Sequence, residues 1–446
     1  SRSDRRKLHF YLKSGGSPAG FPLERLPKPT DDAGVYLFDF GGRVFARSRA
    51  EGKDGNLRVW DEATRRWSVD EETPPFNIDV GPGVLTVTPT EVTYDGRTVI
   101  RMRPGDGRIG ENYYADGWLV FRNIQLEAEP PRSDLVAVRW SPDVAEPVDL
   151  ASGISLRTRT PREFVYAFGQ LSPHVFAATN TGGVYSFDGR SWRVWREPSP
   201  GVSFQIYSMI NYEDRLLMGQ YPTGQLFEFD GKHFRHLENQ PPVMKGVRAS
   251  AREAQTLAIY GGELYAGVWP WGEVWRLDRE SREWRLLGRV FDHPEPTDAT
   301  THPYETETTR LDPVLNRWGQ RVTSFVPQGD ALFISTSAKT SNPFEAKFTF
   351  LEGEKWKDYG AVYRHRLPGS LAVRWKWKEG PTRFDFVVEE DRMSVLQDGV
   401  ELGSAKLDAA DRRNFEPTAV SFGAGVYGKL SGTIRDTHVG SGRRAE

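Results

Sequence analysis

Short runs in which apolar and polar residues alternate, separated by turn residues, occupy most of the chain. One pattern recurs: apolar or aromatic positions, then Asp, often Gly, a polar turn and another aromatic residue. It reads VYSFDGRSWRVW from Val184, LFEFDGKHFRHL from Leu226 and VWRLDRESREWRLL from Val274, with a looser copy, LRVWDEATRRWSV, from Leu57. A period of two is typical of β-strands, and Asp-Gly turns join strands into hairpins. We therefore expect an all-β protein.

The clearest copies recur at a spacing of roughly 40 residues, which is typical of the blades of a β-propeller. A four-stranded sheet covers both of its faces only by stacking against the next sheet, so repeats of this length favour a propeller. We predict a seven-bladed β-propeller over residues 34–360, with the seventh blade following Gln320.

The pattern of apolar and polar positions changes after Tyr363. Strictly alternating strands follow, with an Asp398-Gly399 hairpin and the ending GVYGKLSGTIRD. This segment resembles the final strands of concanavalin-like (laminin-G-like) jelly rolls, which implies a small β-sandwich-like module over residues 361–446. Its length is short for a complete sandwich, so we expect it to borrow a strand from residues 7–13 or to pack against the propeller.

Composition narrows the classes of function. The 446 residues hold 59 Lys and Arg against 61 Asp and Glu, so no nucleic-acid partner is expected. Cys is absent, which excludes disulfides, thiol catalysis and Cys-ligated metals. No apolar run reaches the ~20 residues of a membrane span. The start, SRSDRRKLHF, is compatible with removal of a signal segment, and we expect a secreted bacterial protein, extracellular or periplasmic and monomeric.

Function in a propeller is expected where its loops converge. The turns between the second and third strands of each blade lie at the same end as the links between blades, and the link from Asp292 to Gly319 is much longer than its counterparts. Four residues near this end are candidates for catalysis: His302, Tyr304, Glu253 and Glu305. Seven are candidates for binding substrate: Arg252, Arg321, Gln320, Tyr221, Trp269, Trp271 and Asn180.

Each candidate residue has a chemical property that suits ligand binding or catalysis, and most have a purely structural role as the alternative. Arg forks onto carboxylates, and a His/Tyr pair can take and return protons. Trp269 and Trp271 offer flat faces for sugar rings or wedge between blades. Arg252 and Arg321 bind a ligand or form salt bridges with Glu253 or Glu305.

Familiar motifs are missing. SFDGRSW at Ser186 lacks one residue of the sialidase Asp box, and there is no WD40 signature, phosphate loop, H-E-x-x-H or G-x-S-x-G. No cofactor is expected, and a structural calcium site has no spacing signature.

The repeats and the unequal loops resemble seven-bladed propellers among carbohydrate-active enzymes, notably lyases of ulvan type and enzymes that act on rhamnose-glucuronate linkages. The resemblance implies a polysaccharide lyase that acts on an acidic, uronate-containing glycan by β-elimination. His302 and Tyr304 would be base and acid, and Arg252 and Arg321 would neutralise the uronate carboxylate.

Two alternatives remain. The shortage of His at the mouth leaves room for a glycoside hydrolase that uses Glu253 and Glu305 as its carboxylate pair. A lectin-like or scaffold propeller without catalysis is the alternative from another class.

Overall fold

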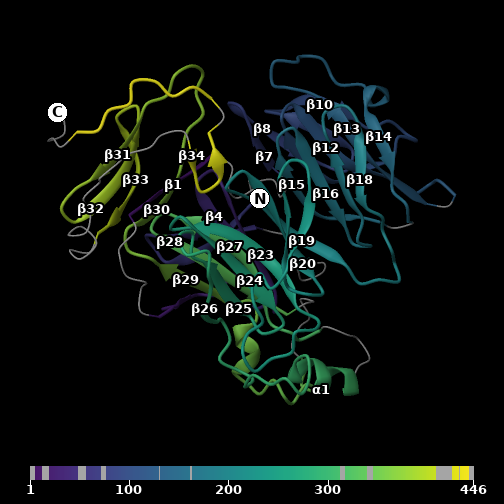
Figure 1. The fold of residues 1–446 in the computed structure, drawn as a ribbon. Helices are drawn as coiled ribbons and strands as arrows, with labels where there is room; N and C mark the ends of the chain where they lie inside the picture. The colour runs from purple at the N-terminus through teal and green to yellow at the C-terminus, as the bar shows by residue number, and fades with distance from the viewer. Residues whose placement is uncertain are drawn as a thin grey trace.

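The computed structural model describes residues 6–12, 20–48, 57–71, 77–129, 131–160, 163–311, 317–338, 345–407, 424–430 and 432–440. These residues form an all-β protein built from repeated four-stranded antiparallel sheets, as in a β-propeller (Figure 1). The one α-helix of the described residues is α1 (Pro303–Leu311), and no helix among them is long and apolar enough to cross a membrane.

Six of the seven four-stranded sheets in the described residues follow the chain in order, from first to fourth strand. They are β3 (Val35–Phe40), β4 (Arg43–Ser48), β5 (Leu57–Asp61) and β6 (Arg66–Asp70); β7 (Asn77–Val80), β8 (Gly83–Val87), β9 (Glu91–Tyr94) and β10 (Arg97–Arg101); β11 (Arg108–Ala115), β12 (Trp118–Gln125), β13 (Arg132–Arg139) and β14 (Ile154–Arg157); β15 (Val165–Leu171), β16 (His174–Thr179), β17 (Val184–Phe187) and β18 (Trp192–Arg196); β19 (Gln205–Tyr212), β20 (Arg215–Tyr221), β21 (Leu226–Phe229) and β22 (Phe234–Leu237); and β23 (Glu253–Tyr260), β24 (Glu263–Trp269), β25 (Glu273–Leu277) and β26 (Trp284–Arg289).

The seventh sheet joins the two ends of this series. Its first three strands are β27 (Arg321–Gln328), β28 (Ala331–Ser337) and β29 (Val362–Arg366), and its fourth is β2 (Glu24–Leu26). The predicted range ends at residue 360, before β29, and does not include β2, because a three-residue strand has no periodicity to read. The sheets therefore run from Glu24 to Arg366, beyond the predicted range of 34–360.

The recurring Asp of the sequence repeat forms the turn between the third and fourth strands. In the clearest copies, one carboxylate oxygen accepts hydrogen bonds from the backbone N–H groups two and three residues later. The distances are 2.9 and 2.8 Å at Asp188, 2.9 and 2.8 Å at Asp230, and 3.0 and 2.8 Å at Asp278. Asp61 makes the same pair of bonds, at 2.8 and 3.1 Å. Asp is favoured here because its short side chain satisfies the turn's donors.

A smaller unit stands beside the seven sheets. Strand β1 (Lys7–Tyr11) pairs with β30 (Ser370–Arg374). They pack with the three-stranded sheet of β31 (Phe384–Val388), β32 (Arg392–Gln397) and β33 (Val400–Lys406) around a core that includes Val373, Met393 and Val395. The pair β34 (Ala424–Gly425) and β35 (Gly428–Lys429) follows, and the rest of the segment after Leu407 lies partly outside the described residues.

This unit lies against the turns that join the first and second strands of several sheets. Arg374 makes two hydrogen bonds of 2.7 Å to Asp79, and Lys7 pairs with Asp39 at 2.9 Å. Figure 1 shows β31–β33 on the opposite side of the molecule from α1. The smaller unit therefore covers the end opposite to the one where the links between sheets lie.

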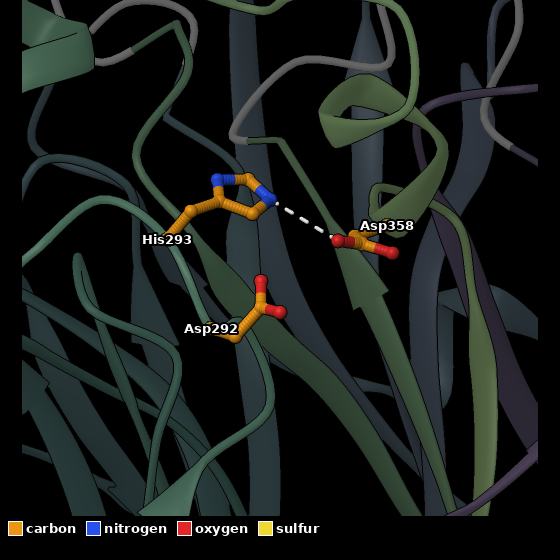
Figure 2. A group of neighbouring side chains, drawn as sticks. All are labelled: Asp292, His293 and Asp358. Atoms are coloured by element: carbon orange, nitrogen blue, oxygen red, sulfur yellow. Dashed lines mark hydrogen bonds and ion pairs between the residues drawn. The ribbon is translucent and has the colours of Figure 1, made fainter.

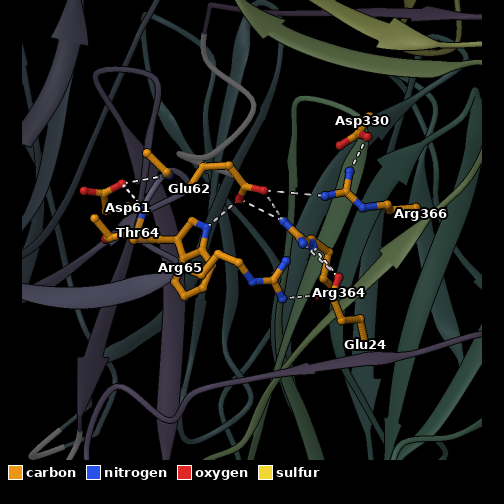
Figure 3. Close-up of polar contacts among 10 residues, drawn as sticks. Glu24, Asp61, Glu62, Thr64, Arg65, Asp330, Arg364 and Arg366 are labelled. Carbon is orange, nitrogen blue, oxygen red and sulfur yellow. Dashed lines mark hydrogen bonds and ion pairs between the residues drawn. The ribbon is translucent and has the colours of Figure 1, made fainter.

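Charged side chains join the seventh sheet to the first (Figure 3). Arg364, on β29, pairs with Glu24 on β2 at 2.8 Å and with Glu62, after β5, at 2.6 Å. Arg65 also pairs with Glu24. Burial opposes ionisation of Glu62, but its hydrogen bonds to Trp60 and Arg364 hold the pKa of that carboxyl below its usual range.

Leu26 offers a test of the joint made by β2. It is buried with Val35 and Trp60 of the first sheet and Val362 of the seventh, so we expect Leu26→Ala to lower the free energy of unfolding by about 2–5 kcal/mol. Val69→Ala is the matched control, because Val69 lies on another outermost strand and is 43% exposed. Urea denaturation of both variants measures the difference; equal stability would contradict a structural role for β2.

Candidate functional site

The links between sheets and the turns between second and third strands lie at one end of the sheets, which we call the link end. The longest link, between β26 and β27, contains α1. His302 precedes this helix: its backbone oxygen accepts from the N–H groups of Glu305 and Thr306 at 3.1 Å, and its Nδ1 accepts from Tyr304 N at 3.2 Å. The long link that was predicted to be functional therefore contains a short helix, and His302 accepts hydrogen bonds from the N–H groups of its first turn.

His302 is not presented to a ligand. Its side chain is fully buried, and its ring centre lies 4.5 Å from that of Trp271. Burial lowers the pKa of His302 to about 3, with Arg289 acting in the same direction. The predicted role as a catalytic base is not supported, because a substrate cannot reach this imidazole.

Glu305 also supports the loop and does not face a ligand. It is 8% exposed, and its carboxylate accepts from Arg317 N at 2.9 Å and from Gly319 N. It thus ties the start of α1 to the segment that leads into β27. The predicted carboxylate pair of Glu253 and Glu305 does not exist as a solvent-facing pair.

Several predicted binding residues are core residues. Trp269 and Trp271 have no exposed surface, so they do not form a platform for sugar rings. Arg252 pairs with Glu273 at 3.0 Å, and both side chains are fully buried. Gln320, also fully buried, donates to the backbone oxygen of His293.

Two further candidates lie in turns at the link end. Asn180 accepts a hydrogen bond of 2.8 Å from Phe164 N, which fixes the start of β15. Tyr221 is half-buried at the end of β20, and its ring centre lies 6.3 Å from that of Trp269.

Arg321 and Glu253 meet in the space that the first strands surround. Arg321 lies on β27 and Glu253 on β23, and they pair at 2.8 Å. The Arg321 guanidinium also lies 5.6 Å from the ring centre of Tyr207, on β19. Arg321 of the seventh sheet thus contacts Glu253 of the sixth sheet and Tyr207 of the fifth. The predicted alternative, a salt bridge between sheets, is what the structure shows for Arg321.

Burial opposes the charge on Arg321, but Glu253 and two neighbouring phenols raise its pKa above the ordinary value. Burial also raises the pKa of Tyr207, with Glu253 adding to the effect. In this central cluster of Arg321, Glu253 and Tyr207, the two opposite charges are buried and compensate each other.

A hollow of about 460 Å³ opens beside the central cluster. It lies between the end of β8 and the first halves of β11 and β15. Tyr166 on its wall is 40% exposed and stacks on Tyr207, with ring centres 5.0 Å apart and planes at 20°. Glu111 lies on the same wall.

A second cavity, of about 530 Å³, lies at the rim of the seventh sheet and is the rim cavity below. His293 lines it, with Asp292 and Asp358 beside the imidazole (Figure 2). His293 Nε2 is 3.1 Å from Asp358 Oδ2, and Nδ1 is 2.7 Å from the Tyr304 hydroxyl. Arg25 pairs with the other oxygen of Asp358 at 2.5 Å.

Three cations and three carboxylates line the rim cavity, and Lys357 pairs with Glu354 at 2.6 Å. Arg25, Lys355 and Lys357 line it together with the acidic groups. Burial raises the pKa of Tyr304 to about 12, so the phenol is protonated at neutral pH. Burial of Asp358 is outweighed by its bonds to His293 and Arg25, which lower its pKa. Tyr304, predicted as an acid, thus belongs to a hydrogen-bonded chain through His293 to Asp358.

Three of the same residues bring together atoms of the kinds that bind metal ions. The ligand atoms of Asp292, His293 and Asp358 lie within 4.8 Å of one another, the one such group among the described residues. Both ring nitrogens of His293 are hydrogen-bonded, and Arg25 is ion-paired with Asp358. A metal would have to displace these bonds, so the arrangement fits proton transfer better than metal binding.

Sequence reasoning missed His293 and Tyr166, which line the two cavities, and Tyr207, which stacks on Tyr166. His293 stood in the long link with His302, and only its Asp neighbour distinguished it. Tyr166 and Tyr207 occupy equivalent places in the repeats EFVYAF and FQIYSM. Both looked like core residues; their shared position in consecutive repeats was the available signal.

Comparisons with known proteins identify no family. No family model matches the chain, and no curated protein matches its sequence. Among solved structures, the chain is similar to the computationally designed Ika8 protein (TM-score 0.40, 12% identity, covering 78% of this chain and 100% of that chain). It is also similar to the WD40 β-propeller domain of Doa1 (TM-score 0.38, 10% identity, covering 80% of this chain and 96% of that chain).

The buried His302 generates a prediction about pH. Its pKa is about 3 in the folded protein against an ordinary 6.5, so between these values only the unfolded chain binds the proton. Its stabilising contribution is therefore full above pH 6.5 and falls as the pH drops. We expect the stability difference between the wild type and His302→Asn to shrink by about 3 kcal/mol from pH 7 to pH 4.

Urea denaturation at each pH measures this difference, and titrations common to both proteins cancel. His233→Asn is the control, because the side chain of His233 is 68% exposed. A pH-independent difference for His302→Asn would show that His302 is not held neutral by the fold.

Proposed function

We propose that the protein is an enzyme that acts on an acidic, uronate-containing glycan, and that the rim cavity is its active site. The observation that carries this proposal is the position of His293: it lines a cavity that holds three cations and three carboxylates, and it is hydrogen-bonded to Tyr304 and Asp358. Acid–base chemistry beside cations suits removal of a proton next to a carboxylate.

β-Elimination is the reaction that fits these groups best. Arg25, Lys355 and Lys357 would hold the uronate carboxylate and lower the cost of charge at the neighbouring carbon. In the free protein Nε2 of His293 is hydrogen-bonded to Asp358, so the substrate has to displace that bond before Nε2 takes the C5 proton, with the Tyr304 oxygen then accepting from Nδ1–H. Asp358, 3.1 Å away, then stabilises the imidazolium.

The imidazolium next gives the proton to the departing O4. The C4–O4 bond breaks as the C4–C5 double bond forms, so the proton moves from carbon to oxygen through one residue. The proposed role of base passes from His302 to His293, and the role of carboxylate neutraliser passes from Arg252 and Arg321 to the cations of the rim cavity.

We further propose that the seven sheets form the seven blades of a closed propeller, with β2 completing the last blade. The pairing of β2 with β29 and the ion pairs between the seventh and first sheets support this arrangement.

Hydrolysis is a second candidate, favoured by one observation. Asp292 and Asp358 both line the rim cavity, with carboxylate oxygens within 4.8 Å of each other. Such closeness is nearer to the carboxylate pairs of retaining glycosidases than of inverting ones.

The test is incubation with a panel of uronate-containing polysaccharides, followed by ultraviolet absorbance of unsaturated uronate and by reducing ends. We expect both signals to grow, and His293→Gln to lower kcat by about 10²–10⁴-fold. His233→Gln is the control with an exposed imidazole. Replacing Lys355 and Lys357 by Met should mainly raise KM.

Other outcomes separate the alternatives. Reducing ends without absorbance, lost in Asp292→Asn, would establish hydrolysis. Binding without either signal would make the protein a lectin, and full activity of His293→Gln would place the chemistry elsewhere.

A further inference from the structure

We propose that the hollow between β8, β11 and β15 is a second binding site, which takes a neutral pyranose residue of a glycan. The hollow alone carries this inference, and it does not require that the rim cavity perform β-elimination. The site differs from the rim cavity in residues, in sheets and in charge.

The walls of the hollow are aromatic. Tyr113 and Phe168 stack with ring centres 5.8 Å apart and planes at 14°, and both line the hollow. Tyr166 adds a third ring, supported from behind by Tyr207. Flat rings held by other rings are rigid, so they bind the apolar face of a sugar with little loss of conformational freedom.

Irregular strand pairing places Tyr166 on this wall. The register between β15 and β16 shifts between Val165 and Ala167, which leaves Tyr166 as the extra residue. The same shift occurs around Tyr207 in β19. A β-bulge turns a side chain out of the regular alternation, and bulges are frequent beside binding sites.

Polar groups are few and are suited to hydroxyls. Glu111 lines the hollow, its side chain is 36% exposed, and its two oxygens are 2.6 and 3.1 Å from nitrogens of Arg122. The register of β11 also shifts at this place, between Ile109 and Asn112. Thr88 and Asn112 are the other polar side chains of the lining.

The charge of the hollow selects the class of sugar. Glu111 is the one charged side chain among the described residues that line the hollow, and its ion pair with Arg122 leaves no net charge there; its oxygens still accept hydrogen bonds from hydroxyl groups. Arg122 does not line the hollow, and no Lys or Arg of the described residues does. A neutral ring therefore fits, whereas the rim cavity, with three cations among its three carboxylates, offers partners for a charged ring. The volume, about 460 Å³, is in the range of small-ligand pockets.

The experiment is calorimetric titration of the full chain with neutral tetrasaccharides, namely cellotetraose, xylotetraose and mannotetraose, and with tetragalacturonate as the acidic counterpart. We expect at least one neutral probe to bind, and we expect Tyr166→Ala to raise the dissociation constant of that probe about tenfold or more. Tyr166→Phe keeps the ring and should bind nearly as the wild type does.

Controls separate local from general effects. Phe386→Ala removes an aromatic ring that is 50% exposed on the smaller unit, and it should leave binding unchanged. His293→Gln should also bind the neutral probe normally, so failure of the elimination chemistry and failure of this site are distinguishable.

Glu111→Gln tests the charge. The substitution keeps the size of the side chain. We expect it to weaken binding of the neutral probe and to reduce the difference in affinity between the neutral probe and tetragalacturonate. The inference is overturned if no neutral probe binds, if Tyr166→Ala binds as the wild type does, or if the acidic probe binds this hollow more tightly.

Discussion

The pairing of β2 with β29 is the constraint on which the rest of the structure depends. Through it, a strand near the start of the chain completes the seventh four-stranded sheet, and Leu26 fills the core between that sheet and the first. Arg364 then holds Glu24 and Glu62 from both sides of the joint. The position of the rim cavity follows, because Arg25 lies on β2 and reaches Asp358.

The two ends of the sheets have different tasks. At one end the smaller unit covers the turns and pairs with them through Arg374 and Lys7. Both cavities are found at the link end. Buried pairs such as Arg252 with Glu273 fix the backbone of the link end. Polar residues that were predicted to bind a ligand thus form buried pairs and hydrogen bonds that hold the backbone at this end.

The sequence predicted the all-β class and the sheets marked by the Asp turn, because that turn is a local structure visible in a few residues. It could not predict β2, whose partner lies far along the chain. It pointed to the link end and to the long link, where the rim cavity lies, but it chose His302 over His293. Both are His residues of one loop, and only packing decides that Trp271 buries the first while the second lines a cavity.

The joint at β2 also has a consequence for synthesis on the ribosome. Glu24 and Arg364 are 340 residues apart in sequence, so β2 emerges long before its partner exists. At about 5–20 residues per second, it waits roughly 20–70 s with unpaired backbone groups. The Asp turns let each hairpin form as it leaves the tunnel, whereas completion of the last sheet is a late event. The nascent chain therefore carries an open sheet edge for most of its synthesis, which is the interval in which a chaperone or a neighbouring chain can bind it.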